Sequence, residues 1–352
     1  MNEIHPDLVR RDQRVIPDDR DEIRLFCALR DEALRMPYFL YYYRRLGVNR
    51  FFMVNNNSVD GSEEFLLQQS DCHVFYTDAS FGASRTGVAW VNSLLDAYGE
   101  ERWNVVADAD ELLVYPSCEE AGLQEFCAWL DRSGYEGVFT LLLDMYSKLP
   151  IKDVAYRQGE DFCGTCPYYD RDYHLVPRIG IPGLRPAFPP FEHIGGPRLR
   201  LCFAGQNTAA VWPRLRVKLL HRLLNLAHSN GLLKNVKAPE PATQAFKVPL
   251  VKWQRGYAYI TNHRLNPIKL APVTGALLHF KYFQDFGKRV NDALATGEHF
   301  GNSSEYKRYA KLLAANPKLS LFYEGSVAYH ESADLVRHGL ITRAPLKYSS
   351  TA

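Results

Sequence analysis

The N-terminal part of the chain alternates short apolar runs, polar loops and helical segments, and this alternation constrains the fold more than any other feature. Apolar runs of strand type occupy residues 23–29 and 50–54, and each is followed by a polar loop and a helical pattern. The helical patterns cover residues 36–46, which Gly47 is expected to end, and residues 63–69. The repetition predicts an α/β fold with a mostly parallel, doubly wound sheet, whose carboxyl-edge loops bind ligands.

A cluster of acids interrupts the next apolar run. Val105 and Val106 precede Asp108, Asp110 and Glu111, after which apolar residues resume. If the strand continued through the cluster, Asp108 and Asp110 would lie on one face, because side chains alternate along a strand. Carboxylates suit Mg²⁺ or Mn²⁺, which complete their coordination with phosphates and water. The alternative is structural: Asp108 caps a turn, and the other two acids are solvated.

These motifs, taken in order, resemble one enzyme family. They are RDE at 30–32, LGV at 46–48, NNSVDGS at 56–62, DADE at 108–111, GGPRLR at 195–200, KVPLVKW at 247–253 and LLHFK at 277–281. The set resembles the family 2-type glycosyltransferases of GT-A fold, in the branch with an RDE-like loop after the first strand and a DNxSxDG-like loop after the second. The resemblance covers residues 22–310, densely before residue 116 and in patches afterwards.

The resemblance implies a nucleotide pocket built from the first loops. Asp60 would contact the base or ribose of the donor, with Arg30, Glu32 and Asn57 lining the same pocket. Asp108 would lie near the ribose or a metal-bound water. The residues also permit a purely local interpretation, since Asn, Ser, Asp and Gly favour β-turns and helix N-caps.

The resemblance also implies a metal that bridges the two phosphates of a sugar nucleotide. Asp108 and Asp110 would hold this ion, Asp110 as the direct ligand, and His279 at the end of the apolar run 273–278 is a candidate further ligand. An imidazole suits Mn²⁺ better than Mg²⁺. Such a metal neutralises charge on the departing diphosphate. A histidine that follows an apolar run is, alternatively, a hydrogen-bonded core residue.

Inverting transfer, which the resemblance implies, needs a general base for the acceptor hydroxyl. Asp144 follows the apolar run 137–143 and would emerge at the same sheet edge, and Glu192 and His193 are alternatives. Three cations are candidates for phosphate or acceptor contacts, although such side chains are usually solvated: Arg198, Arg200 and Lys281.

The resemblance, together with length and composition, suggests a division of the chain. Residues 1–20 are expected to form a loose arm, residues 21–282 the GT-A catalytic domain that the resemblance implies, and residues 283–352 a helical C-terminal extension. Within the catalytic domain, residues 150–213 are rich in Pro, Gly and Tyr and are expected to form loops that recognise the acceptor. The pair Cys163 and Cys166 has no second CxxC motif, which disfavours zinc or redox roles.

Net charge and hydropathy limit the classes of partner that the chain is expected to bind. The formal net charge of +2 over 352 residues lends nucleic-acid binding no electrostatic support. Residues 195–255 are nevertheless basic, and such a face suits lipid phosphates or an acidic polysaccharide, with a solvated surface as the alternative. No apolar stretch approaches the ~20 residues of a membrane span, and residues 1–21 are too charged for a signal peptide. A cytoplasmic enzyme with peripheral contact to the inner face of the membrane is therefore expected.

The expected activity is that of a metal-dependent glycosyltransferase in polysaccharide biosynthesis. It would use Mn²⁺ or Mg²⁺ and move a sugar from a nucleoside-diphosphate donor, with a UDP-sugar expected, to a hydroxyl of a glycan or glycolipid. A nucleotidyltransferase is one alternative, but the loop at residues 30–33 lacks the glycines of a phosphate loop. A non-catalytic carbohydrate-binding relative is another, and intact Asp108 and Asp110 argue against it.

Overall fold

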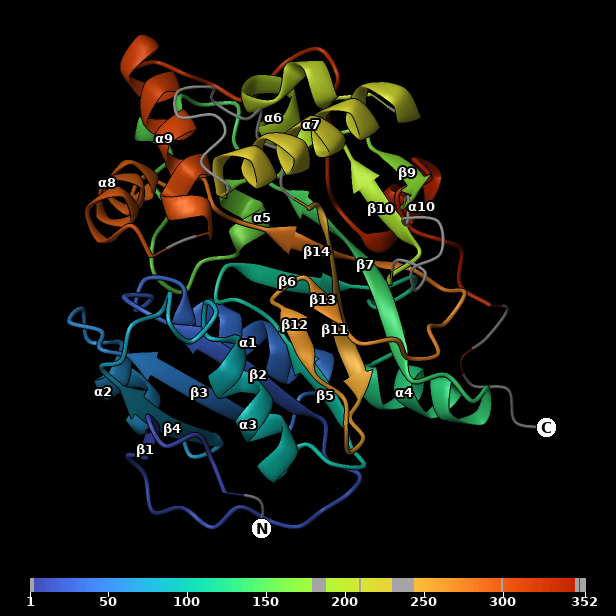
Figure 1. Ribbon diagram of the computed structural model, residues 1–352. Helices are drawn as coiled ribbons and strands as arrows, with labels where there is room; N and C mark the ends of the chain where they lie inside the picture. Colours follow the sequence, from blue (N-terminus) through green and yellow to red (C-terminus); the bar gives the residue numbers. More distant parts are fainter. Residues whose placement is uncertain are drawn as a thin grey trace.

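A mixed nine-stranded sheet forms the centre of the protein in a computed structural model (Figure 1). The structure describes residues 3–178, 188–208, 210–229, 244–298, 300–345 and 348. The strands, in spatial order, are β1 (Val9–Arg10), β4 (Cys72–Thr77), β3 (Arg50–Asn56), β2 (Arg24–Leu29), β5 (Trp103–Val106), β11 (Phe246–Lys252), β7 (Gly137–Asp144), β14 (Gly275–His279) and β6 (Glu111–Val114).

Strand direction confirms the predicted α/β class and refines it. Strands β4, β3, β2 and β5 are parallel to one another, and β7 and β14 share their direction. Strands β1, β11 and β6 run the opposite way, so the sheet is mostly parallel but not uniformly so. The antiparallel strand β11 lies between β5 and β7, and the sequence pattern did not indicate this insertion.

The predicted N-terminal elements are present. Helix α1 spans Met36–Leu46, and α2 spans Ser62–Leu67. Gly47 ends α1 as expected: its N–H still donates to the carbonyls of Tyr43 and Arg44, and its φ of 111° turns the chain so that the Val48 N–H donates to the Tyr43 carbonyl at 2.9 Å. Strands β2 and β3 pair in parallel, so their following loops lie side by side at one edge of the sheet.

Helices cover both faces of the sheet. Helices α1 and α4 (Leu123–Arg132) pack on one face through buried Phe39, Tyr43 and Phe126. Helix α3 (Val88–Tyr98) packs on the other face through buried Trp90 and Leu94. The sheet thus has a hydrophobic core on each face.

The region at 150–213 consists, where it is described, of short elements joined by loops, followed by the start of a longer helix at Val211; residues 179–187 and residue 209 lie outside the described residues. Its elements are η1 (Ile151–Asp153), α5 (Phe162–Thr165), β8 (Tyr168–Asp170), β9 (His174–Pro177), β10 (Phe191–Ile194), α6 (Gly196–Cys202) and η2 (Ala204–Gln206). Strands β9 and β10 pair with each other, and β8 pairs with β15 (Ser326–Ala328).

The C-terminal part contains α8 (Phe286–Thr296), α9 (Phe300–Ala315) and α10 (Ser332–Arg337). Helices α8 and α9 pack together near the ends to which β2 and β3 point (Figure 1). Buried Tyr282, Phe286 and Tyr309 form a separate core beneath them. A small hairpin of β12 (Tyr259–Thr261) and β13 (Arg264–Leu265) follows β11.

The expectation of a loose arm at residues 1–20 is wrong. The described part of this segment, from residue 3, is bound to the central sheet. Strand β1 pairs with β4, and the buried Asp12 accepts a hydrogen bond from the Val74 N–H (2.9 Å). Arg10 donates to the same carboxylate at 2.9 Å. Burial opposes the charged form, but these hydrogen bonds outweigh it and lower the pKa of Asp12. The acids of this segment masked its role as an edge strand.

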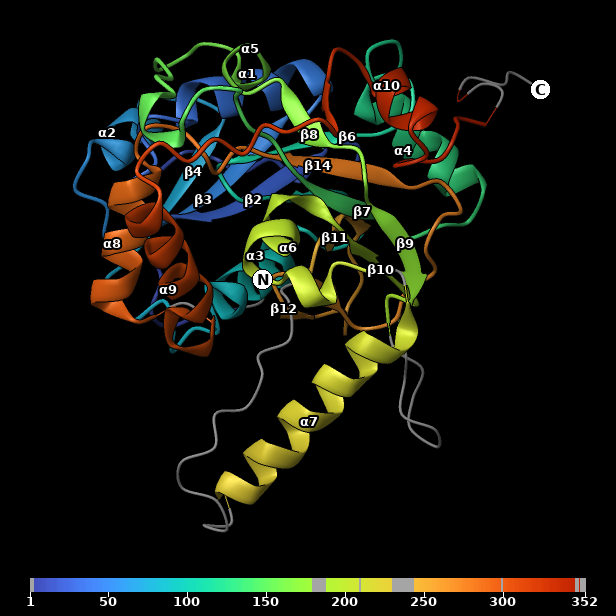
Figure 2. The same ribbon diagram turned by 90° about the horizontal axis from the view of Figure 1, so that it is seen from above.

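Helix α7 (Val211–Ser229) projects away from the rest of the protein, as the view from above shows (Figure 2). It lies in the basic stretch 195–255, of which residue 209 and residues 230–243 are outside the described residues. Among the described helices, none is both long enough and apolar enough to cross a membrane.

Candidate active site

The strand order places a topological switch point at the carboxyl ends of β2 and β5. The chain proceeds outward from β2 to β3 and β4 on one side, and β5 lies on the other side of β2. Loops that follow two such strands diverge, and ligands of open α/β sheets bind in the gap between them. The loop after β2 carries Glu32, and the loop after β5 carries Asp108 and Asp110.

Asp108 and Asp110 lie between two strands and not on a continuing one, which corrects the expectation that they share one strand face. Strand β5 ends at Val106, and β6 begins at Glu111. The turn is closed by the Asp108 N–H, which donates to the Glu111 carboxylate at 3.0 Å. Asp108 remains half exposed, whereas Asp110 is 5% exposed. The two carboxylates therefore differ in their access to solvent.

Lys247 of β11 binds the first part of this turn. Its Nζ lies 2.6 Å from Asp108 Oδ2 and 2.7 Å from Glu111 Oε1. Burial would lower the pKa of Lys247, but these two carboxylates outweigh it and raise that pKa. Burial and the nearby Asp108 raise the pKa of Glu111 to about 7. We assign the pair an ionised state, because an ammonium at 2.7 Å stabilises the carboxylate it contacts. The sequence motif KVPLVKW marked this lysine without revealing its partner.

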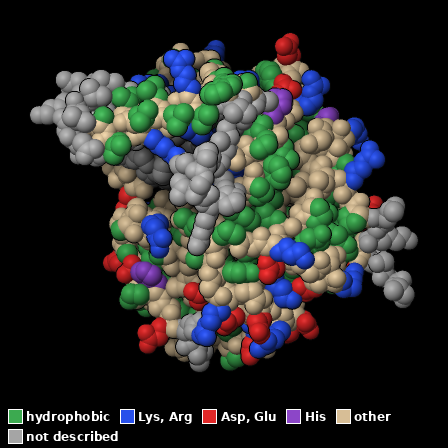
Figure 3. Space-filling view, turned by 45° about the vertical axis from the view of Figure 1, so that its right-hand side comes forward, with side chains coloured by type: hydrophobic (Ala, Val, Ile, Leu, Met, Phe, Trp, Pro, Cys, Tyr) green, Lys and Arg blue, Asp and Glu red, His purple; other side chains and the backbone are tan. Residues whose placement is uncertain are grey.

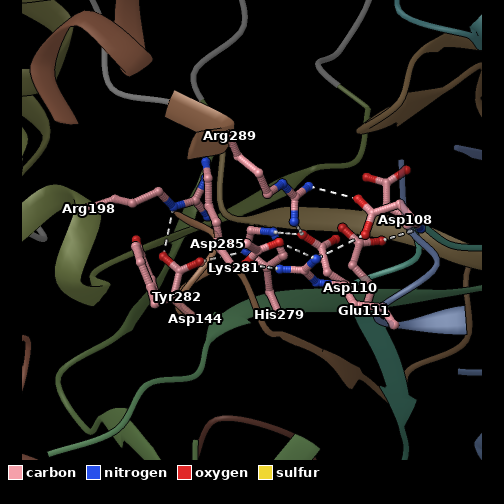
Figure 4. Close-up of polar contacts among 12 residues, drawn as sticks. Asp108, Asp110, Glu111, Asp144, Arg198, His279, Lys281, Tyr282, Asp285 and Arg289 are labelled. Carbon is pink, nitrogen blue, oxygen red and sulfur yellow. Dashed lines mark hydrogen bonds and ion pairs between the residues drawn. The ribbon is translucent and has the colours of Figure 1, made fainter. Parts of the chain in front are cut away.

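Asp110 faces the second cationic group of the site (Figure 4). His279, the last residue of β14, places Nε2 3.6 Å from Asp110 Oδ2, and Arg289 of α8 places a guanidinium nitrogen 3.5 Å from the same oxygen. Burial would raise the pKa of Asp110, yet His279 and Arg289 hold it well below its usual range. Asp110 is therefore an ionised carboxylate in a nearly water-free position.

Asp144 orients His279. The two residues are directly paired across β7 and β14, and His279 Nδ1 lies 2.7 Å from Asp144 Oδ1. Burial disfavours the imidazolium, but Asp110 and Asp144 raise the pKa of His279 to about 9. Arg198 of α6 donates through Nε to the other oxygen of Asp144 at 2.7 Å. Asp144 thus reaches the predicted edge, but both of its oxygens are already bound, which is unfavourable for the proposed general base.

Arg289 and its neighbours were missed by sequence reasoning. Arg289 contacts Glu32 at 2.9 Å as well as Asp110, so it bridges the loops after β2 and β5. The buried Arg35 pairs with Glu32 at 3.1 Å and with Asp285 at 2.8 Å. No local motif marks Arg289, and its one sequence signal is a basic residue on a helix near the LLHFK segment. The C-terminal helices are consequently part of the site.

Lys281 and Glu305 extend the network on the side of Arg198. Lys281 lies 3.2 Å from the Glu305 carboxylate, which also accepts a hydrogen bond from the Tyr309 hydroxyl at 2.7 Å. Arg198 lies 4.0 Å from the same carboxylate. Burial opposes ionisation of Glu305, but the two cations lower its pKa. Lys281 and Arg198 are therefore buried in one ion-pair network near Asp144.

The predicted nucleotide loops are joined through their acids. Asp60 accepts hydrogen bonds from the Ala33 N–H at 2.8 Å and from the Ser62 N–H at 3.0 Å. The turn interpretation is therefore satisfied, while Asp60 itself stays exposed. Asn57 has a φ of 55°, and Tyr76 donates to its side-chain oxygen at 3.2 Å.

Arg30 is exposed at the end of β2. Glu32 is the buried member of this loop, and its N–H donates to Ser62 Oγ at 3.0 Å. Arg30 and Asp60 are thus free to be reached from solvent at the same edge, whereas Glu32 contributes charge from within.

Three predicted site residues have other surroundings. Arg200 forms two hydrogen bonds with Asp170, at 2.9 and 3.1 Å, and lies over the Tyr323 ring. Glu192 lies 3.0 Å from Lys218. His193 stacks on Phe139, and burial lowers its pKa to about 3. These contacts favour structural roles for Arg200 and His193, because each is satisfied or neutral where it lies.

The acids and imidazole suit a divalent cation chemically, although they are not assembled around one point. Within the described ranges, no group of three His, Cys, Asp or Glu side chains is arranged to hold a metal. The reason is visible in the contacts: Lys247 binds Asp108, and Arg289 binds Asp110. The His279–Asp144 pair nevertheless has the form found at metal sites, in which a carboxylate fixes the ligating ring.

Cys163 and Cys166 are poor candidates for chemistry. Cys166 is fully buried, and burial raises the pKa of both thiols. A protonated, buried thiol is neither a good nucleophile nor a metal ligand.

The chain was also compared with known proteins, and neither a protein-family model nor a curated protein matches it.

Proposed function

We propose that this protein is a metal-dependent glycosyltransferase of GT-A fold that uses a nucleoside-diphosphate sugar, with a UDP-sugar as the first donor to test. The observation that carries the proposal is the meeting of Asp110, His279 and Arg289 at the switch point between β2 and β5. A buried carboxylate, an oriented imidazole and a guanidinium are the groups that a metal diphosphate needs. The motif order described above supports the same assignment.

The donor's phosphates would replace carboxylates as the partners of cations in the site. Arg289 now contacts Asp110 and Glu32, and Lys247 contacts Asp108 and Glu111. A metal bound by Asp110, His279 and Asp108 would supply positive charge to the departing diphosphate. Arg289 would then turn from the carboxylates to the phosphate oxygens, for which its planar fork is suited.

Asp144 has a positioning role in this proposal. It receives the Nδ1–H of His279 and so leaves Nε2 directed at Asp110. Because Nε2 carries a proton when the imidazole is charged, metal binding would release that proton. Arg198 keeps Asp144 ionised and in place.

A nucleotidyltransferase is less well supported. The loop after β2 is held by side chains, with the Asp31 N–H donating to Ser58 Oγ at 2.9 Å. Such a loop offers few backbone N–H groups to a triphosphate, in contrast with a glycine-rich phosphate loop.

Donor hydrolysis tests the proposal. The purified chain is incubated with UDP-, GDP-, CDP- and dTDP-sugars, with and without Mn²⁺, and release of nucleoside diphosphate is measured. We expect metal-dependent release from one nucleotide class and a loss of at least 100-fold in Asp110→Asn. The control is Asp292→Asn, an exposed acid on α8. Absence of release from every donor, or full activity of Asp110→Asn, would overturn the proposal.

A further inference from the structure

Helix α7 presents an apolar face to solvent. Trp212, Leu219 and Leu223 are 77%, 47% and 63% exposed. They are seven and four residues apart, so they lie on one side of the helix. The helix has 19 residues, which gives it a length of about 28 Å. Figure 3 shows hydrophobic side chains along α7, which extends toward the upper left of the view.

The charges of α7 are of one sign. Its sequence holds four Lys and Arg residues and no Asp or Glu. Arg216 and Arg222 are exposed, and Lys218 contacts Glu192 in the body of the protein. Arg216 lies four residues after Trp212 and three before Leu219, so it shares their side of the helix. Exposed leucine and tryptophan with arginine among them suit a membrane interface, because the long arginine stem lets its charge reach the lipid headgroups.

We propose that α7 binds the surface of an anionic lipid bilayer, with the face of Trp212, Leu219 and Leu223 at the boundary between headgroups and acyl chains. Charge disfavours a second copy of the chain as the partner of this face. Two paired α7 helices would bring Arg216 and Arg222 together without an acid from either helix. An acidic polysaccharide would pair with the arginines but leave the leucines in water. A bilayer satisfies both.

The position of α7 connects this surface to the site. Helix α6 carries Arg198, which contacts Asp144, and residues 203–210 alone separate α6 from α7. A membrane bound by α7 would therefore lie near the loops expected to meet the acceptor. The proposal concerns location and stands whether or not the chain transfers sugars.

Vesicle flotation of the full chain tests the proposal, with phosphatidylcholine vesicles that either contain or lack phosphatidylglycerol. We expect binding to the anionic vesicles, and a loss on the order of tenfold or more in Leu219→Gln/Leu223→Gln. Arg216→Gln/Arg222→Gln should lose about 25-fold, at about fivefold for each charge near the surface. The matched control is Val15→Gln/Leu149→Gln, which changes exposed apolar residues elsewhere.

Three results would overturn the proposal. The wild-type chain could fail to bind anionic vesicles. The leucine variant could bind as well as wild type while the arginine variant does not, which would favour an acidic polymer. Light scattering could show a dimer that the leucine variant dissociates, which would assign the face to a second copy. Donor hydrolysis without vesicles should be equal in wild type and both α7 variants, so a failure here is separate from a failure of the enzymatic proposal.

Discussion

Asp144→Asn is the substitution that most sharply separates a metal site from a buried ion-pair network. Asp144 is 1% exposed and accepts from His279 Nδ1 and Arg198 Nε, each at 2.7 Å. The amide keeps the size of the side chain but removes its charge. Arg198 would then be left with the Glu305 carboxylate at 4.0 Å as its remaining acidic partner among the described residues.

Two magnitudes follow from this geometry. Removal of one partner of a buried ion pair costs about 3–5 kcal/mol of unfolding free energy. Loss of the carboxylate that orients a ligating histidine typically costs about 10–100-fold in metal affinity. Denaturant unfolding measures the first, and electron paramagnetic resonance of free Mn²⁺ measures the second.

Asp170→Asn is the matched control. Asp170 is 2% exposed, ends β8 and pairs with Arg200 at 2.9 Å, but its ion-pair partner is not part of the site. We expect a similar loss of stability with unchanged Mn²⁺ affinity. Equal Mn²⁺ affinity in Asp144→Asn and wild type would exclude an orienting role of Asp144 at a metal site, as would an equal loss of affinity in Asp144→Asn and Asp170→Asn.

Further outcomes test other parts of the site. Arg289→Ala should reduce donor hydrolysis by about 100-fold or more, since it removes a charge that faces the diphosphate, whereas Lys288→Ala, 76% exposed on the same helix, should leave the rate unchanged; equal rates in Arg289→Ala and wild type would exclude the phosphate role. Because burial lowers the pKa of His193 to about 3, the folded state binds fewer protons than the unfolded state below pH 6.5, so stability present above that pH is lost as the pH falls. In His193→Phe the new ring can still stack on Phe139. Between pH 6.5 and pH 4 the free energy of unfolding of this variant should therefore fall by about 3 kcal/mol less than that of wild type, as measured by denaturant unfolding. Parallel pH curves of the two proteins would contradict the burial of a neutral imidazole.

Local patterns predicted the elements that carry the site but not its internal pairing. The periodic segments before residue 70 became β2, α1, β3 and α2 because apolar spacing and Gly47 act within a few residues. His279 and Asp144 reached one edge because each ends a strand of the same direction.

The remaining features depend on contacts between distant segments. Lys247 binds Asp108 from a strand inserted antiparallel beside β5, and Arg289 binds Glu32 from a helix near the other end of the chain. Such pairs leave no periodic signal in either segment. The turn at residues 107–110 cannot be distinguished from a strand by sequence for a related reason: apolar residues on both sides look continuous until β6 is known to pair with β14.

Nucleotide binding by the apo protein is the most direct test of a metal-dependent donor site at Asp110. Thermal unfolding is followed with UDP, GDP, CDP or dTDP, with and without Mn²⁺, for wild type, Asp110→Asn and Asp292→Asn. We expect stabilisation by one nucleotide that requires Mn²⁺, by about 2.7 kcal/mol at a hundredfold excess over Kd. This stabilisation should be retained in Asp292→Asn and lost in Asp110→Asn. No stabilisation by any nucleotide with Mn²⁺, or stabilisation that persists in Asp110→Asn, would contradict it.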